Sequence, residues 1–302
     1  MRYRDLFGLL LVQLLWGFHW GVLKFGLREF PTLLLMGIRF AIVAALLCPF
    51  FRLPRRQRLP VFWLSLTFGT LNFGLMYAGV AHLGAGTSAI LGQAQVPFAA
   101  LLAAKVFGDR FGARRWLGLA LSFAGILLIM GEPRIGGDLI WAACILGSAL
   151  AAAIGNIQIK RLGPVNSFAL SGWVALFTAP QFLFGSWLIE TGQWQAVRQA
   201  TVLGWGSLSY TVLVVSIGTY CIWYPLLRRY PVNQVMPFTL LVPLFGVISG
   251  IVLLGEHLSL QMVLGGIATI AGVAVIVLRR VPPAREIPSQ CPPDDRAAPE
   301  SV

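Results

Sequence analysis

The first residues that could do chemistry lie in an apolar stretch near the start of the chain. Trp16, His19 and Trp20 stand at positions i, i+3 and i+4, which places them on one face of a helix. Two indole rings around an imidazole would suit the wall of a cavity for a small solute. His19 is also the group in these apolar stretches that could titrate near neutral pH.

A second aromatic triplet repeats this spacing late in the chain. Tyr220, Trp223 and Tyr224 again stand at i, i+3 and i+4. Two interpretations are open, because Trp and Tyr also gather where a helix meets the membrane surface. The triplet either lines the same solute cavity or belongs to an interfacial belt.

One charge falls inside an apolar stretch. Arg39 comes about eight residues into the predicted helix 31–51, and an arginine at the centre of a membrane helix costs on the order of 2.5–3.5 kcal/mol. Something must offset that cost. Arg39 either draws in a carboxylate of the solute, together with Lys24, or bonds helix-end carbonyls and holds the fold.

Two prolines interrupt apolar stretches at corresponding places. Pro97 and Pro243 each remove the hydrogen bond to the carbonyl four residues earlier, which belongs to Gln93 and Thr239. The sequence thus predicts a kink in each half, with a free carbonyl and a polar side chain near mid-membrane. Such kinks suit solute coordination or hinge motion, or are packing features only. Further polar candidates for solute binding are Asn72, Gln95 and Asn156.

The composition requires a bilayer. Of the 302 residues 57% are hydrophobic and 11% are charged, whereas a soluble domain carries roughly 25% charged residues. The net charge of +12 does not indicate nucleic-acid binding, because the basic residues lie in short clusters between apolar stretches. The four cysteines have no metal-binding spacing and the chain has no phosphate-binding loop, so we expect no metal, no cofactor and no ATPase.

The chain predicts an all-α integral membrane protein of ten helices. A spanning helix needs about 20 mostly apolar residues. Lysine and arginine concentrate in the loops on the side of both termini, as at 52–58 and 228–229, which predicts cytoplasmic termini in a bacterial inner membrane. The expected helices are 5–26, 31–51, 60–81, 86–107, 115–131, 137–158, 167–189, 203–224, 233–254 and 261–279.

An internal repeat divides the chain. Gly108-Asp109, Gly118 and Ala124-Gly125 recur at a constant offset as Gly255-Glu256, Gly265 and Ala271-Gly272. We therefore expect two five-helix halves, 1–133 and 134–281, followed by a disordered, proline-rich cytosolic tail, 282–302. Because five is odd, the second half must enter from the opposite side of the membrane, as in many secondary transporters.

The order of these motifs resembles the EamA branch of the drug/metabolite transporter superfamily. The resemblance covers roughly residues 5–280, and the stretches that carry it are Trp16-Gly17, Arg39-Phe40, Ala94-Gln95, Gly108-Asp109, Gly155-Asn156, Leu241-Val242-Pro243 and Gly255-Glu256. It implies ten helices, cytoplasmic termini and efflux by alternating access. In detail the chain is most similar to exporters of amino-acid metabolites of the cysteine and O-acetylserine type. His19 departs from the pattern, which has a small polar residue such as Asn there.

The leading hypothesis is a secondary exporter of a small metabolite, an amino acid or a derivative of one. Its partners would be the solute and the lipid bilayer, and the sequence leaves open whether it forms a homodimer. A transporter of the same fold for a drug, an aromatic amino acid or a sugar derivative is the main alternative. A membrane enzyme acting on a lipid-linked substrate would need clustered acid–base residues, and the three histidines are scattered.

Overall fold

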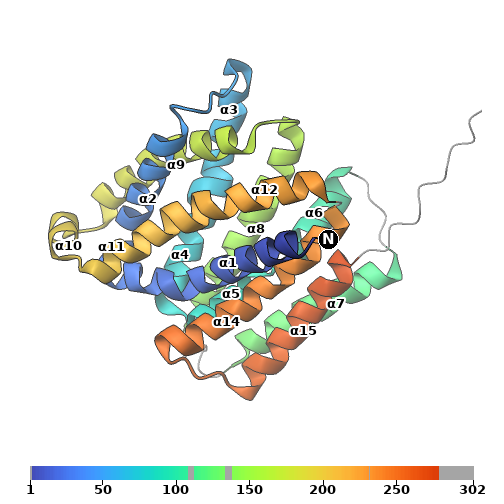
Figure 1. The fold of residues 1–302 in the computed structure, drawn as a ribbon. Coiled ribbons are helices and arrows are strands. Elements are labelled where there is room, and N and C mark those ends of the chain that lie inside the picture. Colours follow the sequence, from blue (N-terminus) through green and yellow to red (C-terminus); the bar gives the residue numbers. More distant parts are fainter. Residues whose placement is uncertain (1, 108–111, 133–137, 231, 279–302) are drawn as a thin grey trace, which may run out of the picture.

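The computed structural model is a bundle of helices (Figure 1) and describes residues 2–107, 112–132, 138–230 and 232–278. Within these ranges, nine helices are long and apolar enough to cross a membrane. The tenth expected crossing corresponds to a shorter helix, Thr32–Leu47. The expected all-helical class is therefore confirmed. The predicted tail 282–302 and the Gly108-Asp109 motif lie outside the described residues.

The elements of the first half follow the order predicted from the sequence. Their bounds are α1 Tyr3–Glu29, α2 Thr32–Leu47, α3 Arg55–Leu64, η1 Ser65–Leu71, α4 Asn72–His82, α5 Ala85–Gly92, α6 Gln95–Phe107 and α7 Ala113–Met130. The later ones follow. Their bounds are α8 Leu139–Leu162, α9 Ser167–Ile189, α10 Gln193–Gln199, α11 Val202–Ser209, η3 Tyr210–Gly218, α12 Thr219–Arg229, α13 Val232–Val235, η4 Met236–Leu240, α14 Leu241–Leu254 and α15 Leu260–Val277.

The second helix is shorter than predicted. We expected 31–51, but α2 ends at Leu47 and a turn follows. Pro49 explains the early end, because a proline has no N–H to continue the helical hydrogen bonds and its ring clashes with the carbonyl four residues earlier. At about 1.5 Å per residue α2 is roughly 24 Å long. It is thus shorter than a typical hydrocarbon core of about 30 Å.

Two long helices contain π-helical segments at equivalent positions. Segment η1 joins α3 to α4, and η3 joins α11 to α12. Adding the repeat offset of 147 to Leu71, the last residue of η1, gives Gly218, the last residue of η3. Such wide turns are rare and are frequent at functional sites. Local side-chain bonds accompany the wide turn of η3, where Ser216 Oγ donates to the carbonyl of Thr211 over 2.8 Å.

The expected proline breaks occur in both halves, but their hydrogen bonding differs from the prediction. Pro97 is the third residue of α6 and Pro243 the third residue of α14, so each lies in the first turn of a new helix. A turn precedes α6 and the 3₁₀ segment η4 precedes α14. The prediction of a free Gln93 carbonyl was wrong, since it accepts the N–H of Val96 over 3.0 Å.

Equivalent helices of the two halves pack against each other. Helix α2 lies along α9, and α7 lies along α15, as Figure 1 shows for α7 and α15. The α7 and α15 backbones come close enough that a Cβ on Gly125 would lie 2.5 Å from the Gly265 carbonyl oxygen, and one on Gly118 2.9 Å from that of Gly272. Because early residues of α7 meet late residues of α15, this pair is antiparallel.

The remaining contacts follow the same symmetry. Helix α1 packs on α14 and on α11–α12, while α8 packs on α5–α6 and on α4. The largest buried apolar cluster runs through α2, α4, α5, α8 and α9. One short helix, α10, was not expected and joins α9 to α11. Helix α8 also continues to Leu162, four residues beyond its predicted end.

Gly125→Ala tests the close approach of α7 and α15. The added methyl group would overlap the backbone of α15, and overpacking typically costs about 1–3 kcal/mol. We therefore expect a lower thermal midpoint for the detergent-purified protein. Gly206→Ala is the matched control, because a Cβ there meets nothing within 4 Å and alanine favours the helix. An unchanged midpoint for Gly125→Ala would contradict this packing.

Candidate functional site

A cavity lies between the two halves. Its volume is about 320 Å³, and its walls come from α2, η1 and α4 on one side and from α8, α9, η3 and α12 on the other. The polar groups that line it are Arg39, Ser167, Ser171, Ser216, Tyr220 and Tyr224. Phe40, Phe68 and Phe73 supply apolar aromatic surface.

A wider cavity adjoins the first one. It measures about 850 Å³, shares Ser167 and Tyr224 with the inner cavity, and extends to Arg229 at the end of α12. We call this end of the bundle the basic face, since Arg58, Arg161 and Arg229 lie at the corresponding helix ends. The inner cavity is therefore approached from the basic face.

Arg39 is the charged group of the inner cavity. Its side chain is only 6% exposed. One guanidinium nitrogen donates to the Tyr77 hydroxyl and another donates to Ser216 Oγ over 3.3 Å. The guanidinium also lies over aromatic rings, 5.0 Å from the centroid of Phe73 and 5.3 Å from that of Phe40. Its Nε has no hydrogen-bond partner within the described residues.

These neutral partners can hold the charge. Cation–π contacts contribute about 0.5–2 kcal/mol each, and hydrogen bonds to a charged group about 1.5–3 kcal/mol each. Together they can offset the roughly 2.5–3.5 kcal/mol that an arginine costs in the membrane. Because all of these partners are neutral, the positive charge of Arg39 stays available to an anion in the cavity. This geometry does not agree with the alternative in which Arg39 bonds helix-end carbonyls.

A directional chain of hydrogen bonds leads away from Arg39. Thr211 Oγ donates to the Ser207 carbonyl over 2.8 Å, so it can only accept from His19 Nδ1, which lies 3.4 Å away. In a neutral imidazole Nε2 then carries no proton, and it lies 3.4 Å from the Tyr77 hydroxyl, from which it can accept. The Tyr77 oxygen in turn accepts from Arg39.

This chain defines the role of His19. A neutral imidazole with its proton on Nδ1 fits these directions, whereas a protonated His19 would present a second donor to Tyr77 beside the Arg39 charge. His19 therefore connects helices rather than offering a charge to the cavity. The chain crosses between the two halves, because Tyr77 and His19 belong to α4 and α1, while Thr211 belongs to η3.

The expected aromatic triplets come together only in part. Trp16 lies edge-on to Tyr220 and to Trp223, with ring centroids 6.0 and 5.1 Å apart, and its Nε1 donates to Thr219 Oγ over 2.9 Å. Tyr220 joins this cluster to the inner cavity. Trp20 points elsewhere: a Cβ on Gly92 of α5 or on Gly246 of α14 would lie 3.2 to 3.4 Å from its ring.

The other predicted binding residues do not line the inner cavity. Asn72 is buried and donates to the Phe68 carbonyl in its own helix over 3.2 Å. Thr239 likewise donates to the carbonyl of Met236 over 2.7 Å. Gln93 and Gln95 are half-buried at the break between α5 and α6, and Asn156 is exposed on the surface of α8.

Several polar residues of the site were not predicted: Tyr77, Thr211, Ser216, Ser167 and Ser171. The repeat contains a signal for the first of them. Subtracting the offset of 147 from Tyr224 gives Tyr77, and subtracting it from Tyr220 gives Phe73. Both lie beside Arg39. Thr211 and Ser216 give no such signal, since their positions depend on the π-helical turn.

The described residues offer no site for a metal ion, because none of their His, Cys, Asp and Glu side chains form a group of three suited to one. The cysteines within the described ranges, Cys48, Cys144 and Cys221, are free. The chemistry of the site is thus that of a cation, several hydroxyl groups and aromatic rings around a cavity.

The described residues form a bundle with nine helices of membrane-crossing length and a polar cavity between the two halves. Such a bundle defines a multi-pass membrane protein of the transport class. The EamA-like transporter family matches residues 5–131 and again residues 139–278. The chain belongs to this family, and the two matches give it a duplicated domain. The expected resemblance is confirmed, and because the family consists of transporters, the chain is not an enzyme.

Several known proteins are similar over nearly the whole chain. A probable amino-acid metabolite efflux pump of Salmonella typhimurium is 32% identical, over 92% of this chain and 96% of its own. A protein of the same description from Escherichia coli is 30% identical, over 89% and 93%. An uncharacterized inner membrane transporter of Escherichia coli, YedA, is 26% identical, over 95% and 96%.

A solved crystal structure also superposes on this fold. The TM-score is 0.61 at 15% sequence identity, over 88% of this chain and 95% of the other. At this identity the likeness concerns the fold alone. It adds no information on the solute.

A cysteine at Ser171 tests access to the inner cavity. In a chain whose native cysteines are replaced by alanine, we expect Ser171→Cys to react with a small thiol reagent, because Ser171 lines the cavity. Thr178→Cys, two turns further along α9, is the control, since Thr178 is fully buried. Mass spectrometry would measure both rates. A cavity that is open in solution should make them differ at least tenfold, and equal rates would contradict it.

Proposed function

We propose that this protein exports an amino acid or an amino-acid derivative from the cytoplasm by alternating access. The observation that carries the proposal is Arg39, a buried cation with neutral partners at the wall of a cavity between the two halves. A guanidinium binds a carboxylate with two parallel hydrogen bonds. The unpartnered Nε of Arg39 is free for one of these bonds.

The rest of the cavity agrees with a small solute that has a carboxylate. Its volume of about 320 Å³ falls at the lower end of the roughly 300–1,000 Å³ typical of small-molecule sites. The hydroxyl groups of Ser171, Ser216 and Tyr220 could accept hydrogen bonds from an amino group. The aromatic rings offer both apolar surface and faces for a cation.

The membrane arrangement belongs to the proposal. We infer ten crossings with α2 as the tenth, two halves of opposite orientation at 1–133 and 134–281, and both termini in the cytoplasm of a bacterial inner membrane. The antiparallel packing of the equivalent helices α7 and α15 supports the opposite orientation. If the basic face is cytoplasmic, as the positive-inside rule indicates, the cavity is open toward the cytoplasm.

The relatives support the same class of solute. Two of them are described as probable amino-acid metabolite efflux pumps. The cavity also favours one specific alternative, an aromatic amino acid, because Phe40, Phe68, Phe73 and Tyr224 line it. Both solutes would place their carboxylate at Arg39.

Proteoliposomes containing the purified protein would test the function. A panel of labelled amino acids and derivatives, aromatic ones included, is loaded inside, and the loss of each is measured with and without the protein. We expect protein-dependent efflux of at least one solute that carries a carboxylate. Efflux confined to solutes without a carboxylate, or no efflux across the panel, would contradict the proposal.

Two substitutions of Arg39 should distinguish the contribution of its charge to efflux from that of its paired hydrogen bonds. We expect Arg39→Gln to lower efflux at least tenfold, because the charge that binds the carboxylate is lost. Arg39→Lys should retain partial activity, since a lysine keeps the charge but not the paired hydrogen bonds. Arg198→Gln, on the exposed helix α10, is the control and should transport normally. Normal efflux by Arg39→Gln would remove Arg39 from the site.

A further inference from the structure

Four glutamates lie at the end of the bundle opposite the basic face. Glu29 and Glu190 are at the C-terminal ends of α1 and α9, Glu132 follows α7, and Glu256 follows α14. We call this end the acidic face. Three of them, Glu29, Glu190 and Glu256, accept hydrogen bonds from backbone N–H groups at the start of another helix.

Glu190 binds the start of α2. Its two carboxylate oxygens accept the backbone N–H groups of Leu33 and Leu34 over 2.7 and 3.0 Å. The first N–H groups of a helix have no partner within the helix, and the positive end of the helix dipole favours a negative charge there. Glu190 therefore holds the start of α2 against the end of α9.

Glu256 does the same for α5. Its carboxylate accepts the N–H groups of Ala85 and Gly86 over 2.5 and 3.0 Å. Glycines make room for the side chain, since a Cβ on Gly250 would lie 2.4 Å from Oε2 and one on Gly84 3.0 Å from it. The fit is thus built from both α14 and α5.

Two more contacts complete the set. Glu29 accepts the N–H of Thr201 over 2.6 Å and also its hydroxyl, directly before α11. Glu132 accepts the hydroxyl of Ser259 over 2.6 Å, and Ser259 caps the start of α15. All four contacts connect a helix of the first family repeat with a helix of the second. We call them the inter-half caps.

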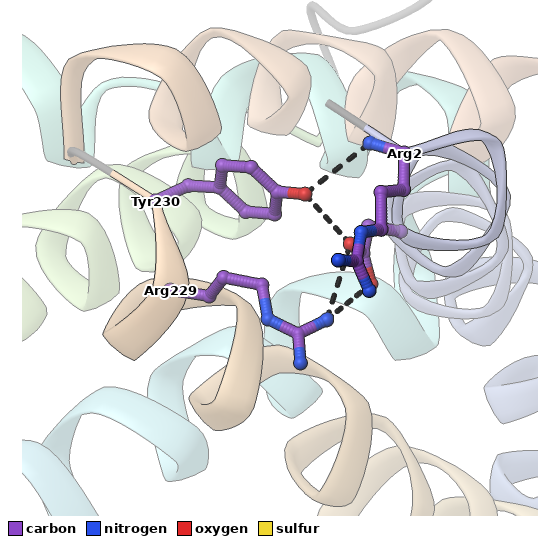
Figure 2. A network of polar contacts seen from close by, with 4 residues as sticks. Arg2, Arg229 and Tyr230 are labelled. Atoms are coloured by element: carbon purple, nitrogen blue, oxygen red, sulfur yellow. Dashed lines mark hydrogen bonds and ion pairs between the residues drawn. The ribbon is translucent and has the colours of Figure 1, made fainter.

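The basic face is connected differently. There, Asp5 of α1 binds Arg229 over 3.1 Å and Tyr230 over 2.6 Å at the end of α12, and Tyr230 also accepts the N–H of Arg2 (Figure 2). Beside this network the 850 Å³ cavity lies between α9 and α12, which both belong to the second half. Within the described residues, the halves are thus bonded to each other at both faces, while the cavities that lead to Arg39 lie toward the basic face.

We propose that the inter-half caps form the gate that closes the acidic face and must open for the solute to leave on that side. The inference rests on the proposed alternating access, in which the halves separate first at one face and then at the other. Each cap opposes that movement, because its donor and acceptor belong to different halves. Glu29, Glu132, Glu190 and Glu256 are then gating residues, although none lines the inner cavity.

The chain from Arg39 to Ser207 forms a second layer behind the caps. It crosses between the halves through His19 and Thr211, and Ser207 Oγ donates to the Val22 carbonyl over 2.7 Å. A solute carboxylate at Arg39 would compete with Tyr77 and Ser216 for the guanidinium. Solute binding would thereby loosen this layer and favour opening of the acidic face.

A buried cysteine can report the state of the gate. Leu208 lies on α11, inside the caps, and is 3% exposed. In a chain whose native cysteines are replaced by alanine, Leu208→Cys should react slowly with a membrane-impermeant maleimide. Adding Glu190→Gln and Glu256→Gln should raise the labelling rate at least tenfold, because a neutral amide offers one acceptor in place of two charged ones. Each single substitution should raise it less.

Controls separate gating from a loss of structure. Asp5→Asn removes a carboxylate from the basic face and should leave the labelling rate within twofold. Glu256→Asp keeps the charge, so the cysteine of Leu208→Cys should react more slowly with Glu256→Asp than with Glu256→Gln. Thermal midpoints identify any variant that unfolds. A labelling rate that stays within twofold when both glutamates are replaced, in a protein with a normal midpoint, would overturn the gate.

The side of labelling distinguishes this inference from the proposed function. Intact cells should show the increase if the acidic face is periplasmic. An increase only in inverted vesicles would support the gate and contradict the proposed orientation. Because the maleimide measures access and not transport, the result does not depend on the identity of the solute.

Discussion

A polar group inside a membrane must find its partner within the protein, because lipid offers none. This constraint accounts for the main features of the fold. The Arg39 charge rests on aromatic rings and hydroxyl groups, and the helix starts at the acidic face bind carboxylates from the other half. Each of these contacts joins elements that are distant in the sequence. The same contacts that make the bundle compatible with lipid therefore also hold the two halves in one arrangement.

The irregular parts of the backbone lie where the site needs them. Segment η3 supplies both Thr211 and Ser216, and η1 supplies Phe68 to the cavity wall. A wider turn changes the direction in which the following side chains point, so the residues after η3 face a different neighbour than an unbroken α-helix would give them. Because both π segments occupy equivalent places, a π-helical turn stands on each side of the cavity.

Much of this fold can be predicted from the sequence. Hydropathy locates the helices, and the glycine pattern of α7 and α15 reveals the repeat, because close packing leaves room only for small residues. Arg39 can be identified from its cost in the membrane. The partners of Arg39 cannot, since spacing along one helix gives its faces but not the neighbour that each face meets. For the same reason the sequence could not show that Trp16 packs on Tyr220, that Trp20 lies against α5 and α14, or that Asn156 is exposed.

The pairing of α7 with α15 also explains why the internal repeat can be recognised in the sequences of these two helices. Ser122 donates to the carbonyl of Thr269, its own counterpart 147 residues later. The pseudo-twofold axis that relates the halves therefore passes between these two positions. Gly118 and Gly125 meet Gly272 and Gly265, the counterparts of each other's places. A larger side chain at one of these glycines would overlap the backbone of the other helix beside that helix's own glycine. A substitution along this contact is thus opposed by both helices at once.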